Sequence, residues 1–363
     1  MTLRKAYLKI GSTIGIAVMT MVGIFISSER EVHQNNAFTR RYPHHPITKH
    51  YNLNLQYNSY YIAGYHENNL YLGNTTAPLH VLKIDLETQD TTTINIRITN
   101  KNLLFSAVKV HILTPYFYVM DGRVPVIFRG SIHDWEADIW LNDKVYFMNA
   151  LPIDSTKLYI RTISSKTNET ILGSMSNAGD VELRLKPNLI EKQMDGVFDV
   201  DGKMIVSQSG ATTGYVYYYR NQYLVMDSNL QLILKEHTID TVSIAQLQLA
   251  TNKNNQIKMS APPLQINKSA ALTDDLVLIQ SDRLGKYERK EMLKQAAIID
   301  IYNWQQKTYE FSLYFYNVNG ESIREFNLYD GYMVGLAGTW LSVYRTKKEH
   351  FKSTNPNDKS IGQ

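Results

Sequence analysis

The fold is decided by one stretch of sequence, Tyr223-Leu224-Val225-Met226-Asp227, then Ser-Asn, then Leu230-Gln231-Leu232-Ile233-Leu234. Two apolar runs separated by a short polar turn are typical of a β-hairpin. Asp227 ends the first run, where its carboxylate can accept hydrogen bonds from backbone amides of the turn. The same layout recurs at residues 79–96 and 297–313, and helical periodicity is nearly absent between residue 47 and residue 345. The sequence therefore predicts an all-β body built from hairpins.

The spacing of these hairpins indicates how they are arranged. Asp85, Asp227 and Asp300 each end a first strand, and Asp85 and Asp227 lie 142 residues apart. If three units intervene, each has about 47 residues, within the roughly 40–50 residues of a four-stranded propeller blade. We therefore predict a six-bladed β-propeller, with inner strands near residues 58–64, 106–111, 145–150, 196–200, 265–271 and 322–328. The alternatives are seven blades, since Thr241–Pro263 could hold further strands, and a pair of β-sandwiches.

The last blade lacks a fourth strand of its own. Three apolar runs lie between Arg324 and Tyr344, and the chain becomes charged and polar after Arg345. Tyr51–Tyr57, ahead of the first blade, alternates apolar and polar residues. We expect this segment to pair near Trp340–Tyr344 as the outer strand of the last blade. The pairing would close the ring and cover both free edges.

The N-terminus contains a candidate membrane segment. Arg4, Lys5 and Lys9 precede Ile10–Ile26, which contains 17 residues and no charge. As a helix it reaches about 25 Å, at the short end of the length that spans a bilayer. The basic flank predicts a cytoplasmic N-terminus and an exported body. We expect a single-pass anchor in the inner membrane with the body in the periplasm. The alternative is a cleaved signal peptide that releases a soluble periplasmic protein.

Composition divides the chain into four segments: a membrane anchor or signal segment at 1–27, a stalk or linker at 28–46, the β-propeller at 47–346 and a polar tail at 347–363. Pro43 and Pro46 favour extended chain in the stalk. Within the body, Lys286–Gln295 is rich in good helix formers. It is expected to form a surface helix inserted between two strands of one blade.

Composition also excludes several classes of function. The 363 residues are 44% apolar, which is ample for a buried core. A net charge of +4 indicates no nucleic-acid partner. With no cysteine, disulfides, thiolate metal sites and cysteine nucleophiles are ruled out. The common phosphate-binding, serine-hydrolase and zinc-protease motifs are missing. We therefore expect no cofactor and no metal site.

Five residues are candidates for ligand binding. His111 ends an expected inner strand and would lie near the central channel. Arg161 and Arg220, the latter followed by Asn221, lie on or beside aromatic-rich strands, where arginine can stack on tyrosine or hold an anion. His80 lies within a predicted strand, where a half-buried, hydrogen-bonded imidazole is the more common outcome.

Several segments carry a resemblance to a known family: Leu70–His80, Gln193–Phe198, Tyr219–Asp227, Ala261–Pro263 and Ile301–Tyr314. Together they resemble a family of exported, propeller-like proteins of Bacteroidetes, over roughly residues 55 to 345. The resemblance implies a TolB-like six-bladed fold but no particular reaction. The chain has no lipobox cysteine, which departs from many exported propellers of these bacteria.

These observations favour one functional class over another. A membrane anchor joined to a propeller without a catalytic motif predicts a periplasmic binding or scaffold module, with an unknown ligand and an envelope protein as partner. The alternative is a periplasmic hydrolase or lyase acting through channel residues such as His111. The sequence leaves the enzyme question open while leaning against it.

Overall fold

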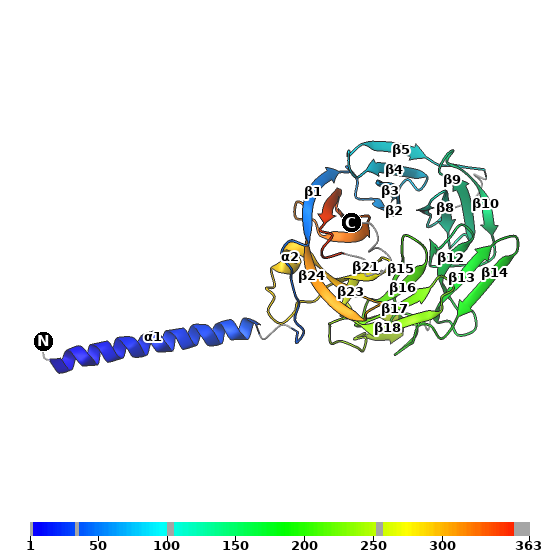
Figure 1. Cartoon of the computed structure of the whole chain (residues 1–363). Coiled ribbons are helices and arrows are strands. Elements are labelled where there is room, and N and C mark those ends of the chain that lie inside the picture. The colour runs from blue at the N-terminus through cyan, green and yellow to red at the C-terminus, as the bar shows by residue number, and fades with distance from the viewer. Residues whose placement is uncertain (1–2, 33–35, 100–104, 252–256, 352–363) are drawn as a thin grey trace, which may run out of the picture.

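The computed structural model describes residues 3–32, 36–99, 105–251 and 257–351. Six sheets of four or five strands surround a common axis, and a long helix projects from the ring (Figure 1). This arrangement confirms the predicted all-β, six-bladed propeller. The segment Thr241–Pro263, considered above as room for a seventh blade, contributes a two-stranded hairpin of β19 (Leu249–Thr251) and β20 (Ile257–Met259) within its described residues.

Blades 1 to 3 follow one another along the chain. Blade 1 contains β2 (Tyr60–His66), β3 (Asn69–Asn74), β4 (His80–Asp85) and β5 (Thr91–Asn95). Blade 2 contains β7 (Lys109–Leu113), β8 (Tyr116–Asp121), β9 (Val126–Ser131), β10 (Glu136–Asn142) and the outermost β6 (Arg97–Ile98). Blade 3 contains β11 (Asn149–Pro152), β12 (Lys157–Ile163), β13 (Thr170–Asn177) and β14 (Val181–Lys186).

Blades 4 to 6 complete the ring. Blade 4 contains β15 (Gly202–Val206), β16 (Thr212–Tyr217), β17 (Gln222–Asp227) and β18 (Leu232–His237). Blade 5 contains β21 (Asn267–Leu272), β22 (Leu276–Ser281), β23 (Ala296–Asn303) and β24 (Thr308–Tyr316). Blade 6 contains β25 (Ile323–Tyr329), β26 (Tyr332–Ala337), β27 (Trp340–Thr346) and β1 (Ile47–Asn54).

Strand β1 closes the ring, as the sequence predicted. It pairs antiparallel with β27 from Ile47 opposite Thr346 to Asn54 opposite Trp340. The side chains of Asn52 and Ser342 are hydrogen-bonded at 2.8 Å across this pair. The strand begins at Ile47, four residues earlier than predicted. Pairing the first and last strands of the ring covers strand edges that would otherwise be free to pair with other molecules.

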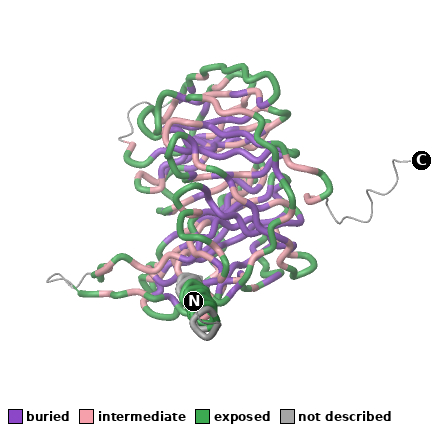
Figure 2. Tube along the Cα trace, turned by 90° about the vertical axis from the view of Figure 1, so that its left-hand side faces the viewer, coloured by how far each residue is buried: buried purple, intermediate pink, exposed green. Residues whose placement is uncertain are grey.

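The apolar core is distributed around the ring. Six clusters of buried apolar side chains each fill the space between two neighbouring blades, and the buried positions follow the strands throughout the body (Figure 2). The inner strands β2, β7, β11, β15, β21 and β25 contact one another in turn, with β25 against β2. Each blade therefore depends on both neighbours for its burial, and the inner strands together form the channel wall.

Two expected inner strands are displaced in the structure. The strand predicted near 196–200 is β15 at Gly202–Val206, and the strand predicted near 145–150 is β11 at Asn149–Pro152. The chain ahead of β15 forms a turn because the Asp199 carboxylate accepts hydrogen bonds from the backbone amides of Gln193, Met194 and Gly196. The apolar residues within 196–200 therefore belong to this turn and not to the inner strand.

The stalk expected at 28–46 differs from the structure at both of its ends: residues 28–32 belong to helix α1 (Leu3–Val32), and residues 36–46 dock on the ring. Phe38 is 8% exposed, and the Arg40 side chain is fully withdrawn from solvent. The Ser312 amide of β24 donates to the Arg41 carbonyl at 2.8 Å, so the segment lies along blade 5. Apolar burial and buried ion pairs thus hold residues 36–46, which composition alone described as a free linker.

The helix expected over Lys286–Gln295 is also much shorter. Only α2 (Met292–Gln295) is helical, although the insertion does lie between β22 and β23 of one blade, as predicted. The Glu288 carboxylate accepts a hydrogen bond from the Gly285 amide at 2.7 Å and forms an ion pair with Arg40. These contacts hold the first part of the insertion in turns. Tertiary partners therefore override its helix propensity.

The projecting helix is α1 (Leu3–Val32). Its segment Lys9–Ile26 has a mean hydropathy of 1.8, and none of that segment is buried against the rest of the protein. By length and composition this helix can cross a membrane.

Candidate functional site

A cavity of about 820 Å³ lies at the axis of the ring, lined by residues from the inner strands of all six blades. Its apolar wall includes Tyr61 and Ile62 of β2 and Ala270 to Leu272 of β21. The Tyr61 hydroxyl accepts a hydrogen bond from the Val110 amide at 2.6 Å, which ties blade 1 to blade 2 at the wall. Gly64 allows close approach of the same two blades, since a Cβ there would lie 2.4 Å from the Ile112 carbonyl oxygen. The cavity is large enough for a small ligand.

The cavity wall is basic. Five basic residues line it: Lys109, Arg123, Arg161, Lys203 and Arg324. Among the described residues, Glu325 is the only acidic residue that lines it. This excess of positive charge in a concave site of low dielectric constant concentrates a positive electrostatic potential inside the cavity.

Lys109, Lys203 and Arg324 belong to three different blades. Each is the first or second residue of an inner strand, namely β7, β15 and β25. Inner strands of successive blades run in the same direction, so these positions lie at the same end of the channel. Burial, and then the charge of Lys203, lower the pKa of Lys109. The two lysines are therefore close enough to repel each other.

His111 lines the same cavity, as the sequence analysis expected. Burial, followed by the nearby charges of Lys109 and Lys203, lowers the pKa of its imidazole to about 3. The ring is therefore neutral at physiological pH. Within the described part of the chain it has no hydrogen-bond partner, so its polar edge remains available to the cavity.

Arg161 also lines the cavity, but its guanidinium is engaged by the protein. It forms an ion pair with Asp201 at 2.5 Å and hydrogen bonds with the Gly202 carbonyl and the Asn149 side chain. The Tyr215 hydroxyl lies 3.4 Å away. Burial lowers the pKa of Arg161, but Tyr215 and Asp201 outweigh that effect and the net shift is upward. Arg161 therefore joins blade 3 to blade 4.

The other three sequence candidates lie outside the cavity. Arg220 is 1% exposed and stacks on Tyr217, with its guanidinium carbon 3.7 Å from the ring centroid. Asn221 donates to the Asp240 carbonyl and contacts His237 at 3.0 Å. His80 contacts the Tyr60 hydroxyl at 3.1 Å. All three have protein partners, which indicates structural roles.

Sequence reasoning missed Lys109, Lys203, Arg324 and Glu325. Each lies near the start of an inner strand; β7 and β25 were predicted close to their observed positions, but β15 was predicted near 196–200, which left Lys203 outside its strand. No group of three or more histidine, aspartate or glutamate side chains suitable for a metal ion occurs among the described residues.

Comparisons with known proteins support the fold. No protein-family model matches the chain, and no curated protein matches it. Among solved structures, it is similar to a member of the DUF4221 family from Bacteroides vulgatus, with a TM-score of 0.53 and 10% identity, covering 83% of this chain and 97% of that one. At that identity the likeness shows the fold alone.

A second solved structure is the β-propeller domain of Cps50 (Swd1) from Myceliophteria thermophila, with a TM-score of 0.45 and 9% identity. The similarity covers 83% of this chain and 100% of that domain. The propeller is a fold that hosts many unrelated functions.

Proposed function

We propose that this protein is a membrane-tethered binding and scaffold module, whose propeller lies in the periplasm and presents its central channel to a ligand or an envelope protein. The observation that carries the proposal is the docking of residues 36–46. Helix α1 ends at Val32, and Asn36 is already bound to blade 5. Val32 and Asn36 are four residues apart in the chain and can be separated by at most about 14 Å, so the ring is held close to the end of α1.

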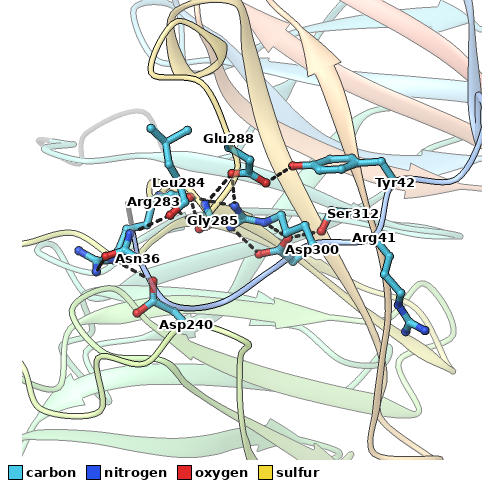
Figure 3. Close-up of polar contacts among 12 residues, drawn as sticks. Asn36, Arg41, Tyr42, Asp240, Arg283, Leu284, Gly285, Glu288, Asp300 and Ser312 are labelled. Atoms are coloured by element: carbon cyan, nitrogen blue, oxygen red, sulfur yellow. Dashed lines mark hydrogen bonds and ion pairs between the residues drawn. The ribbon is translucent and has the colours of Figure 1, made fainter. Parts of the chain in front are cut away.

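The docking contacts are specific. Arg40 forms ion pairs of 2.6 Å with both Glu288 and Asp300, and all three side chains are nearly or fully buried. Figure 3 shows Tyr42 directed at Glu288, while Asp300 lies beside Ser312 of β24. Nearer the membrane segment, Asn36 donates to the Leu284 carbonyl at 2.8 Å and accepts from Arg283. A flexible stalk would need none of these contacts, so they support a ring with a set orientation on its anchor.

A hydrolase or lyase acting through His111 has less support. An imidazole with a pKa of about 3 is a weak base at neutral pH, because burial and two nearby lysines oppose its protonation. No carboxylate orients it within the described residues. The charged groups that line the described channel are five cations and one glutamate, which suits binding better than proton transfer.

The tether is tested by topology. Since the chain has no cysteine, a single cysteine at Lys166, on an exposed turn of blade 3, is a unique probe of the propeller. A membrane-impermeant maleimide should label it in intact spheroplasts, whereas a cysteine at Lys9 should react only after lysis. The protein should also stay in the membrane pellet after carbonate washing. A mature N-terminus between residues 27 and 35 would contradict the tether.

The binding function is tested separately by crosslinking in spheroplasts and purification of the intact protein from the membrane. We expect a partner in stoichiometric amount. The Lys166→Gln variant, changed at an exposed turn that does not line the channel, should retain it. Recovery of a lone monomer under mild detergent conditions would contradict a scaffold role.

A further inference from the structure

The channel carries positive charge that the protein does not neutralise. Arg161 is paired with Asp201, whereas Lys109 forms no ion pair within the described residues. The contact between the Lys203 ammonium and Glu325 is long, at 3.9 Å. The other Glu325 oxygen accepts a hydrogen bond from the Ile62 amide at 3.1 Å. One partly engaged carboxylate therefore faces several cations.

Lys109 and Lys203 are placed so that one ligand could contact both of them. Lys109 comes from blade 2 and Lys203 from blade 4. The charge of Lys203 nevertheless helps to lower the pKa of both Lys109 and His111. The lysines thus face the same part of the cavity from separate blades. Two like charges held in a partly buried site repel, and an anion between them would remove that repulsion. Blade-to-blade packing holds both strands, so little ordering would be needed on binding.

His111 supplies a neutral polar group in the same region. It lies two residues after Lys109 on β7, so both side chains leave the strand on the same face. A neutral imidazole can donate one hydrogen bond from its N–H and therefore suits an oxygen ligand. This part of the wall therefore provides the ammonium groups of Lys109 and Lys203 together with the hydrogen-bonding imidazole of His111.

We propose that the channel binds a small oxyanion, a phosphate or carboxylate group, between Lys109 and Lys203 with His111 as a hydrogen-bonding partner. This inference names a ligand class for the proposed binding function and rests on that function only in taking the channel as the binding site. It is independent of the membrane tether.

The test uses the full chain in detergent at low salt, with inorganic phosphate and succinate as separate probes and glycerol as the neutral control. Calorimetry should detect at least one anion and no glycerol. Lys109→Gln and Lys203→Gln should each weaken binding about tenfold or more, because a charge-assisted contact inside the channel is lost. Lys109→Arg, which keeps the charge, should retain most of the affinity, and Lys166→Gln all of it. The phosphate and succinate arms distinguish the two sources of the oxyanion.

A second readout depends on geometry and does not require a variant. Imidazole carbon-13 resonances of labelled histidine should show that bound anion raises the pKa of His111, because a nearby negative charge favours the protonated ring. Binding that persists unchanged in the Lys109→Gln, Lys203→Gln double variant would overturn the proposal. So would absence of binding by the wild type. Either result would leave the topology and partner experiments standing.

Discussion

The Arg40 guanidinium lies 2.6 Å from the Asp300 carboxylate, although 260 residues separate them in the chain. Arg40 comes from the segment that follows α1, and Asp300 lies within β23 of blade 5. Neither side chain exposes more than 3% of its surface. The link between α1 and the ring therefore includes a buried charge network with little solvent around it.

Arg40→Ala should destabilise the propeller by about 3–5 kcal/mol, because the buried carboxylates of Glu288 and Asp300 would lose their ion pairs with Arg40. Chemical denaturation of the full chain in detergent measures the loss. The matched control is Arg41→Ala, the exposed neighbour, which should cost about 1 kcal/mol or less. Equal losses in the two variants would contradict a buried network centred on Arg40.

Breaking β1 should open the ring. Amides of an outer strand point alternately toward and away from the neighbouring strand, so Asn52→Pro combined with Leu53→Pro removes at least one bond to β27. We expect a lower melting temperature and soluble oligomers by light scattering, since the β27 edge becomes free. His50→Ala, at the irregular position between Lys49 and Tyr51, should behave like the wild type. A monomeric double variant with unchanged melting would show that closure contributes little.

Arg220→Lys tests the structural role of a residue considered for binding. An ammonium cannot reproduce the flat stacking on Tyr217 or the hydrogen bond to the Glu191 carbonyl at 2.8 Å. The expected loss is about 1–3 kcal/mol, with no change in anion binding. Arg97→Lys, at an exposed ion pair with Glu136, should change stability by about 1 kcal/mol or less. Reduced anion binding at full stability would instead place Arg220 at the site.

Asp121 should make stability depend on pH under acid conditions. Burial raises the pKa of its carboxyl, but hydrogen bonds from the backbone amides of Ala107, Ser106, Val124 and Arg123 outweigh that effect and lower it. Because the folded pKa lies below the unfolded value, the contribution is present above about pH 4 and is lost as pH falls through the folded pKa.

Melting temperatures between about pH 5 and pH 2 measure this contribution. Asp121→Asn should flatten the acid limb of the profile, while Asp138→Asn, at an exposed position of β10, should leave it as in the wild type. If the melting temperature of the Asp121→Asn variant falls with acid as steeply as that of the wild type, other carboxylates control acid unfolding.

The turn aspartates show how far local pattern extends. Asp85 and Asp227 act as the sequence predicted, since each carboxylate accepts backbone amides of its own hairpin turn. Asp300 has the same local setting, but the turn begins three residues later at Asn303, whose side chain accepts the Gln306 amide. The carboxylate of Asp300 instead binds Arg40, a partner that no local pattern indicates.

The candidate site also contains residues that the sequence could place and residues that only the structure brings together. His111 could be placed near the channel because it lies on a recognisable inner strand. Lys109, Lys203 and Arg324 could not be grouped, since they lie on strands of three blades and the start of β15 was predicted several residues too early. Arg161 and Arg220 were plausible ligand residues by type, and their neighbours Asp201 and Tyr217 engage them.

By itself the sequence determined the hairpins, their repeat, the ring closure by β1 and the apolar N-terminal helix. The hairpins and the helix depend on alternation, turn chemistry and hydropathy, which act between residues close in the chain. The closure joins distant strands, but it followed from the alternation of Tyr51–Tyr57 and the missing fourth strand of the last blade. Only the tertiary structure decided that residues 36–46 dock on blade 5 and that the channel is basic. Both depend on the desolvation and pairing of charges from distant strands, and that balance exists only once the blades have packed around their axis.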